Sequence, residues 1–254
     1  MEQFILLFTF LIFLLACKVE YSRVLLIITT KEITMEKLTL FGAHLSPYVR
    51  KTRLILAYKG IGYKHIPVVP FGSDQPAEFK ENSPLGKIPL LKVGERYIPD
   101  SSVICLFLER EVPTPTILPS DSYDAARVQW FEEYADSFMV SAIGGHLFAE
   151  RILAPFIFKR EPIQADIDQA LSNEIPTIFD YLSRELQGDY LVGDQLTLAD
   201  IAICGVFVAM HHCQVRCDTD KWPELAKYID RVTSLDFFQK VVGEEQMMLK
   251  AISG

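Results

Sequence analysis

The chain has 254 residues, half of them hydrophobic, and a formal net charge of −8 at pH 7. This proportion of apolar residues allows a sizeable buried core and excludes an intrinsically disordered protein. The acidic balance, without any run of Lys and Arg, argues against a nucleic-acid-binding protein, because such proteins present clustered positive charge.

The first 34 residues form a hydrophobic extension. The stretch 4–17 is apolar except for Thr9, but as a helix it would rise only about 21 Å, less than the ~30 Å core of a bilayer. It resembles the core of a signal peptide, although Glu2 stands where a basic residue belongs. Met35 lies just before the first expected strand, so three interpretations stay open: an over-extended reading frame, an export signal or a membrane anchor. Residues 1–34 are therefore kept apart from the fold.

Residues 35–111 alternate between short apolar strands and amphipathic helices. The elements expected in chain order are a strand at 38–41, a helix at 47–59, a strand at 63–69, a helical stretch at 76–81, strands at 88–92 and 96–98, and a helix at 101–110. Gly60 and Gly62 end the first helix, as glycine commonly does. The order predicts a mixed sheet with helices on both faces, which is the thioredoxin-like arrangement.

Residues 112–120 contain three prolines and are typical of a linker. After the linker every long segment has helical periodicity, with helices expected at 125–158, 162–186, 197–212, 222–233 and 236–249. Gly144, Gly145 and Pro155 predict a kink or break in the first of these. The fold class expected is therefore an α+β thioredoxin-like N-terminal domain (35–111) followed by an all-α helical C-terminal domain (121–254).

The five cysteines are too few and too irregularly spaced for a disulfide framework. Cys213 and Cys217, close to His211 and His212, suggest zinc, but no second ligand pair with zinc spacing accompanies them. We expect reduced thiols at a helix end and no metal.

Four motifs fall at the ends of the expected elements. They are 41–50 (FGAHLSPYVR), 82–91 (NSPLGKIPLL), 99–104 (PDSSVI) and 196–201 (LTLADI). Each has a structural explanation when taken singly. Ser46, Asp100 or Ser101 would cap a helix, and Thr197 with Asp200 would form a capping box. The order and spacing of the four motifs are much harder to explain by chance.

Together the motifs resemble those of the cytosolic glutathione transferases, over residues 37–250. The resemblance is strongest to the serine-type classes, such as the plant phi and tau classes and bacterial relatives, because Ser46 stands at the position of the active-site serine. The maleylacetoacetate isomerase branch has a Ser-rich, Cys-containing loop there, which this sequence lacks.

The resemblance implies that Ser46 is catalytic and that its Oγ donates a hydrogen bond to the glutathione sulfur. Lowering a thiol pKa of about 8.5 by two units requires about 2.7 kcal/mol. One hydrogen bond to a charged group supplies roughly 1.5–3 kcal/mol, and a helix N-terminus adds about 0.3–1 kcal/mol. These contributions suffice without a side-chain base.

The second and third motifs are implied to bind the tripeptide. In the resembled family the Ile88–Pro89 bond is cis, and the backbone of Ile88 pairs with the cysteinyl backbone of glutathione. Lys87 is a further expected contact. Ser101 and the helix N-terminus are expected to bind the γ-glutamyl carboxylate, while Asp100 faces its ammonium group. The fourth motif is structural in the family.

The resemblance also implies an apolar pocket for an electrophile between the Ser46 loop and the helical domain. The candidates are His44, Leu45 and Tyr48 for the near wall and Tyr134, Phe138 and Phe148 for the far wall. The helical spacing of the far-wall residues is equally consistent with ordinary core.

The function expected is conjugation of the glutathione thiolate to small apolar electrophiles, with glutathione as co-substrate and no metal; a peroxidase side activity is compatible with Ser46. The alternative is a non-catalytic module, because the fold also holds partners in translation and stress assemblies. A disulfide exchanger is disfavoured, since serine cannot form a mixed disulfide. The resemblance implies a cytoplasmic homodimer without a nucleic-acid partner. Membrane contact, tethering or export is expected only if residues 1–34 are a real anchor or signal.

Overall fold

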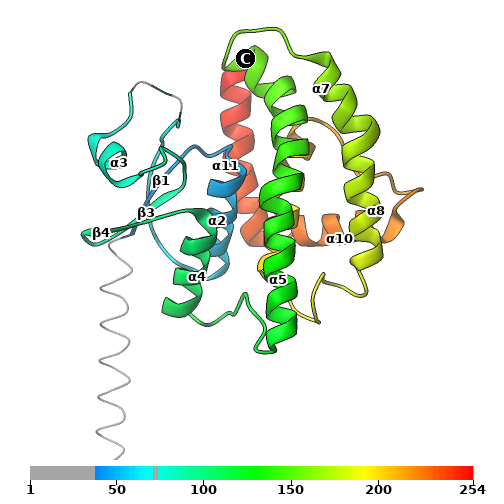
Figure 1. Ribbon diagram of the computed structural model, residues 1–254, viewed down its shortest axis with the longest axis horizontal. Coiled ribbons are helices and arrows are strands. Elements are labelled where there is room, and N and C mark those ends of the chain that lie inside the picture. Colours follow the sequence, from blue (N-terminus) through cyan, green and yellow to red (C-terminus); the bar gives the residue numbers. More distant parts are fainter. Residues whose placement is uncertain (1–37, 71, 73, 254) are drawn as a thin grey trace, which may run out of the picture.

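The computed structural model describes residues 38–70, 72 and 74–253 (Figure 1). The interpretations of residues 1–34 and of Met35 lie outside these residues. Within the described part of the chain, no helix is long and apolar enough to cross a membrane.

The N-terminal unit is a four-stranded sheet with helices on both faces (Figure 1). Its elements are β1 (Leu38–Phe41), α2 (Pro47–Tyr58), β2 (Lys64–Ile66), α3 (Ala77–Asn82), β3 (Leu90–Val93), β4 (Arg96–Pro99) and α4 (Ser101–Glu111). The strand order is β2-β1-β3-β4, in which β1 and β2 are parallel and the other pairs are antiparallel. This is the thioredoxin-like arrangement that the sequence predicts.

Alternation along the strands divides the sheet between two cores. In the pairing of β1 with β3, Leu40 lies opposite Leu91 and Phe41 lies opposite Leu90. Leu40 and Leu91 belong to the large core that α2 and α4 share with the helical unit. Phe41 and Leu90 belong to a small core with Phe79 of α3. One face of the sheet therefore supports the helix that carries Ser46.

The second strand is shorter than predicted. The sequence predicts residues 63–69, whereas β2 covers only Lys64–Ile66. Pro67 follows β2 directly, and proline has no backbone N–H to donate to a neighbouring strand. The ladder with β1 accordingly ends at the pair Phe41–Ile66.

The C-terminal unit is helical throughout its regular elements. They are α5 (Ser122–Tyr134), η1 (Ala135–Leu153), α6 (Ala154–Phe156), α7 (Gln164–Gln169), η2 (Ala170–Glu174), α8 (Ile175–Glu185), α9 (Leu198–His212), α10 (Pro223–Thr233) and α11 (Asp236–Ser253). Helical structure continues from α5 through η1 into α6. The sequence predicts a kink or break at Gly144, Gly145 or Pro155, and no break falls at the two glycines, because both lie inside η1. The helix ends at Phe156, one residue beyond Pro155.

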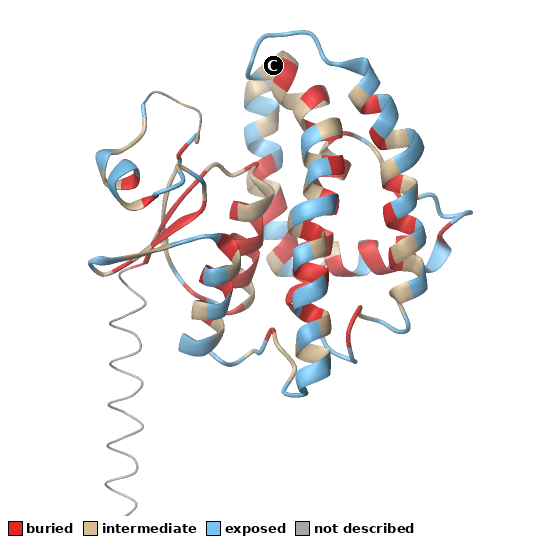
Figure 2. Cartoon of the chain, in the orientation of Figure 1, coloured by how far each residue is buried: buried red, intermediate tan, exposed pale blue. Residues whose placement is uncertain are grey.

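Figure 2 shows buried residues on the faces where the helices pack together and exposed residues on their outer faces. Helix α9 is the central element of the helical unit, and its residues from Leu198 to Met210 are all buried. It packs against α5, η1, α10 and also α2 of the first unit. The predicted capping box at its start is confirmed. The Asp200 carboxylate accepts hydrogen bonds from the Thr197 backbone at 2.8 Å and from the Tyr228 hydroxyl at 2.9 Å. The fourth motif is thus structural, and it fixes the helix against which α2 rests.

Candidate active site

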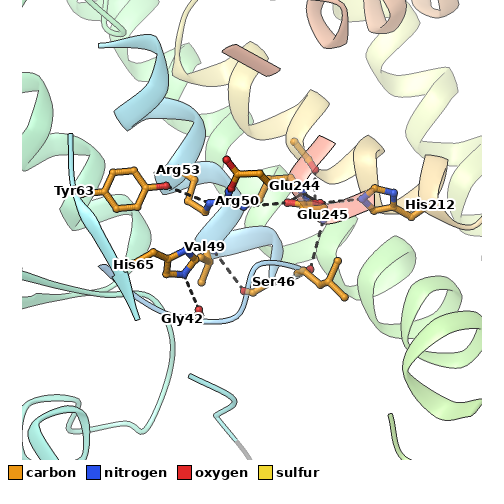
Figure 3. Close-up of polar contacts among 12 residues, drawn as sticks. Gly42, Ser46, Val49, Arg50, Arg53, Tyr63, His65, His212, Glu244 and Glu245 are labelled. Atoms are coloured by element: carbon orange, nitrogen blue, oxygen red, sulfur yellow. Dashed lines mark hydrogen bonds and ion pairs between the residues drawn. The ribbon is translucent and has the colours of Figure 1, made fainter. Parts of the chain in front are cut away.

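Ser46 is the N-cap of α2 (Figure 3). Its Oγ accepts a hydrogen bond from the Val49 backbone at 3.4 Å, which is long for such a bond. Pro47 at the first helical position has no N–H, so the cap has fewer backbone donors to satisfy. The side chain is half-buried, and its hydroxyl proton has no acceptor among the described residues. The Ser46 hydroxyl at the N-terminus of α2 therefore keeps its capacity to donate a hydrogen bond.

The second motif lies next to the Ser46 loop. The Ile88–Pro89 peptide bond is cis. Gly42 is the link between the two segments, because a Cβ there would lie 2.4 Å from Cγ2 of Val49 and 3.5 Å from Cβ of Ile88. Any side chain at position 42 would therefore collide with the Val49 side chain in the first turn of α2. Lys87 is exposed beside this contact.

The third motif begins α4. Asp100 is the N-cap, and its Oδ1 accepts from the backbones of Ser102 at 2.9 Å and Val103 at 3.2 Å. Its φ of 78° lies in the left-handed region, which costs energy for a residue with a side chain and is tolerated best by Asn and Asp. Ser101 is buried directly after it. The helix-cap explanation of Asp100 therefore holds, and one carboxylate oxygen remains beyond the cap.

The near wall of the expected pocket carries no charged imidazole at neutral pH. The rings of His44 and His65 lie in tilted contact with centroids 4.1 Å apart, and Nε2 of His65 pairs with the Gly42 carbonyl at 2.9 Å. Burial lowers the pKa of His65 to about 4. Burial, with the nearby Arg53 guanidinium, also lowers the pKa of His44. Leu45, the third near-wall candidate, is buried.

Tyr48 joins the near wall to the helical unit. Its hydroxyl donates to the backbone carbonyl of Asp136 in η1 at 2.9 Å. Burial and the Asp136 carboxylate raise the pKa of Tyr48, so the phenol keeps its proton at neutral pH. The structure thus brings the Ser46 loop to η1 at Asp136.

The far-wall candidates lie in the packing of the helical unit. The Tyr134 ring packs in tilted contacts against Phe138, at 5.6 Å between ring centroids, and against Tyr181 of α8, at 4.8 Å. Phe148 is buried, and its ring lies 6.4 Å from that of His212 on α9. The aromatic partners of these candidates all belong to the helical domain. Their place in a substrate pocket stays a prediction.

Sequence reasoning missed a buried charge network behind Ser46 (Figure 3). The Arg50 guanidinium binds the Glu245 carboxylate of α11, with Nε 2.9 Å from both oxygens and Nη2 2.8 Å from Oε2. It also donates to the carbonyls of Gly205 at 3.0 Å and Leu45 at 3.5 Å. His212 pairs with the same carboxylate at 2.9 Å. Both members of the Arg50–Glu245 pair are wholly buried.

A second buried cation of α2 reaches the long helix of the other unit. Lys51 Nζ lies 2.6 Å from Oε1 of Glu132 and contacts Asp136 and Ser102 as well. Burial raises the pKa of Asp136, while Lys51 opposes that rise. Basic residues on a helix ordinarily indicate a face exposed to solvent, so the burial of Arg50 and Lys51 was not predicted. The available signal was the presence of acidic residues in α5, η1 and α11, among them Glu132, Asp136 and Glu245.

No group of three or more His, Cys, Asp or Glu side chains within the described residues is placed to hold a metal ion. Cys213 and Cys217, which suggested zinc, are each buried, and burial raises the pKa of each thiol to about 12.

Comparison with known proteins yields a consistent set of matches. Residues 40–116 match the family model of the glutathione S-transferase N-terminal domain, and residues 147–236 match that of the C-terminal domain. Glutathione S-transferase Z2 from Arabidopsis thaliana is 30% identical over 215 residues, which cover 83% of this chain and 92% of that protein. The solved structure of a glutathione S-transferase from Methylobacterium radiotolerans, in complex with glutathione sulfonate, is 26% identical with a TM-score of 0.64. That alignment covers 81% of this chain and 94% of the other.

Two further relatives bear on class and on the alternative function. A zeta-class glutathione S-transferase from Euphorbia esula is 28% identical, covering 83% of this chain and 92% of that protein. Elongation factor 1-gamma 2 from Oryza sativa is 24% identical, covering 76% of this chain but only 46% of that protein. The phi- or tau-like assignment is not supported by these matches, which instead include the zeta class. The two family models match both units, and the Arabidopsis relative is 30% identical over most of the chain. The chain therefore belongs to the glutathione S-transferase family.

Proposed function

We propose that the chain catalyses attack of the glutathione thiolate on an electrophilic carbon of a small apolar compound. The observation that carries this proposal is the hydroxyl of Ser46, which lies at the N-terminus of α2 with its proton free for a ligand. The adjacent cis bond between Ile88 and Pro89 supports the same assignment.

In this proposal Ser46 donates to the sulfur and lowers the pKa of the thiol, while the N-terminal end of α2 adds a favourable dipole. Backbone groups of Ile88 align the cysteinyl residue. Lys87 contacts the peptide, and Asp100 with Ser101 holds the γ-glutamyl group at the start of α4. The rate then comes from thiolate formation and from placing the two reactants together.

We assign the electrophile to the space in front of His44, Leu45 and Tyr48. The neutral histidines and the protonated phenol favour an uncharged, apolar compound there. Tyr134 and Phe138 remain proposed for the opposite wall. The chemistry is of the serine type in this proposal, although a relative of the chain belongs to the zeta class.

We also propose that the protein works as a homodimer in the cytoplasm. Apolar side chains lie exposed on the consecutive helices α4 and α5: Val103, Leu106, Tyr123 and Trp130. Exposed apolar side chains gathered on neighbouring helices are typical of a protein interface. Sedimentation of the wild type and of Trp130→Glu tests this proposal: a dimer that the substitution converts to a monomer is expected.

The proposed activity is tested by titrating the thiolate absorbance of bound glutathione against pH. We expect a thiol pKa well below that of free glutathione in the wild type and a return toward the free value in Ser46→Ala. Ser122→Ala, an exposed serine at the start of α5, is the matched control. Bound glutathione with the same pKa in all three proteins would contradict the proposed mechanism.

A second candidate is a non-catalytic module, which the similarity to elongation factor 1-gamma favours. It predicts that the chain is not retained on immobilised glutathione, or that bound glutathione keeps its ordinary pKa. Retention together with a lowered pKa that depends on Ser46 would exclude it.

A further inference from the structure

A cavity of about 350 Å³ opens between α9, α10 and α11, in the helical unit. Val208 and Val242 form its apolar floor, and both side chains are buried. The other lining residues are polar, and they come from the last turns of α9 and α10, the loop after α9 and one face of α11. No residue of the proposed glutathione site lines it.

The α10 wall offers hydrogen-bond acceptors. Asp230, Thr233 and Ser234 lie at positions i, i+3 and i+4, which places them on one face of the last turn. The Thr233 hydroxyl donates to the Ile229 carbonyl at 2.8 Å, and the Ser234 hydroxyl donates to the Arg231 carbonyl at 2.9 Å. Both protons are therefore directed to the backbone, and both oxygens are left to accept. The Asp230 carboxylate has no ion-pair partner among the described residues.

The wall beyond α9 offers a cationic donor. Arg216 Nη1 donates to the carbonyls of His211 at 3.0 Å and Val215 at 3.1 Å. These two bonds hold the guanidinium in place and leave Nε and Nη2 without a carboxylate partner in the described part of the chain. Burial, helped by Arg216, lowers the pKa of His211 to about 4, so its ring adds no charge at neutral pH. The cavity thus presents one positive and one negative side chain that do not pair with each other.

We propose that this cavity binds a small zwitterionic amino compound of the free α-amino acid class. Its ammonium group lies on Asp230, Thr233 and Ser234, and its carboxylate lies on Arg216. An ammonium has three N–H donors, and the α10 face presents three oxygen acceptors at the carbonyl end of a helix, which favours a cation. A guanidinium binds a carboxylate through two parallel hydrogen bonds. A simple anion would be repelled by the Asp230 carboxylate, and a simple amine would be repelled by the Arg216 guanidinium. Neither therefore satisfies both walls.

Calorimetric titration of the full chain with each of the twenty free L-amino acids identifies the best-bound probe. Two analogues of that probe, one lacking the ammonium group and one lacking the carboxylate, are then titrated in the same way. We expect the amino acid to bind at least tenfold more tightly than either analogue, a difference of about 1.4 kcal/mol. Equal binding of the amine or of the acid, or no binding of any amino acid, would overturn the proposal.

Two variants assign the binding to this cavity. Arg216→Gln and Asp230→Asn are each expected to weaken the amino acid at least tenfold. Both residues are exposed at the rim, so neither change should affect folding, which circular dichroism checks. Glu224→Gln, at the other end of α10, is the matched control and should bind like the wild type. Undiminished binding by both variants would place the amino acid elsewhere and refute this site.

Discussion

The two ends of one turn of α2 differ in how their polar groups are used (Figure 3). At the N-cap, Ser46 is half-buried and accepts a single hydrogen bond of 3.4 Å. Four residues later, Arg50 is wholly buried and bonded to Glu245, Gly205 and Leu45. Ser46, the proposed partner of the glutathione thiol, keeps most of its hydrogen-bonding capacity free, whereas Arg50 behind it uses that capacity to fix the helix.

The buried cations also connect different parts of the chain. Arg50 reaches α11, Lys51 reaches α5 and η1, and Lys59 donates to the carbonyls of Val112 and Pro115, both at 2.7 Å. The helix that begins at Ser46 is therefore held in part by contacts outside its own domain. We expect substitutions in the buried charge pairs to change the stability of the fold, and substitution of Ser46 to change the pKa of bound glutathione.

Glu245→Gln should have the largest effect on stability. It leaves Arg50 buried without a full counter-charge, which typically costs about 3–5 kcal/mol of unfolding free energy. Urea denaturation measures this change. Glu224→Gln is the control, because Glu224 and its partner Lys227 are exposed, and it should change stability by less than about 0.5 kcal/mol. A loss as small as the control's would contradict the role given to the network.

Lys51→Met should cost less, roughly 2 kcal/mol at neutral pH, because Glu132 and Asp136 keep some contact with solvent. Without the lysine, the two carboxylates repel each other and favour uptake of a proton. The penalty should therefore shrink as the pH falls toward the range where carboxylates protonate. Unfolding curves of both proteins across that range measure this trend. A penalty that does not depend on pH would argue for lost packing as its cause.

Acid should weaken the fold through His65 and His211, whose pKa values are each lowered by burial from 6.5 to about 4. In that window the unfolded chain binds a proton that the folded protein does not, so stability falls as the pH drops from 6.5 toward 4. Allowing for solvent screening, each histidine contributes on the order of 1 kcal/mol. His65→Gln and His211→Gln should each flatten the pH dependence of unfolding. An unchanged slope in both would refute the assignment.

Ser46→Ala should have the smallest effect on stability. Loss of a helix cap costs about 0.5–2 kcal/mol, and the long bond from Val49 places this cap at the lower end. The same substitution should remove the lowering of the glutathione pKa. A large loss of stability with unchanged thiol chemistry would reverse the contrast between the two regions.

The sequence was sufficient for features that depend on local pattern. The helix cap at Ser46 follows from a serine and a proline between a strand and a helix, and the Thr197–Asp200 box follows from spacing alone. Features set by tertiary contact were not accessible. The burial of Arg50 depends on Glu245, which is 195 residues away in sequence, and an arginine on an amphipathic helix ordinarily faces water.

The same limit explains the remaining differences. Two consecutive glycines typically mark a break, but Gly144 and Gly145 stay helical because η1 packs along α9, which offsets their low propensity. Tyr134 has the spacing of either a core or a pocket residue, and only its partner Tyr181 on a separate helix shows how it packs.

The charge pairs of α2 limit which helical units could replace the one in this chain. A hybrid that joins this N-terminal unit to another helical unit would carry Arg50 and Lys51 into a new interior. Unless the incoming helices supply carboxylates at the positions of Glu132 and Glu245, the hybrid would bury charges without counter-ions. Recombination at the linker is thus constrained by electrostatic matching, and the two units are expected to evolve as one.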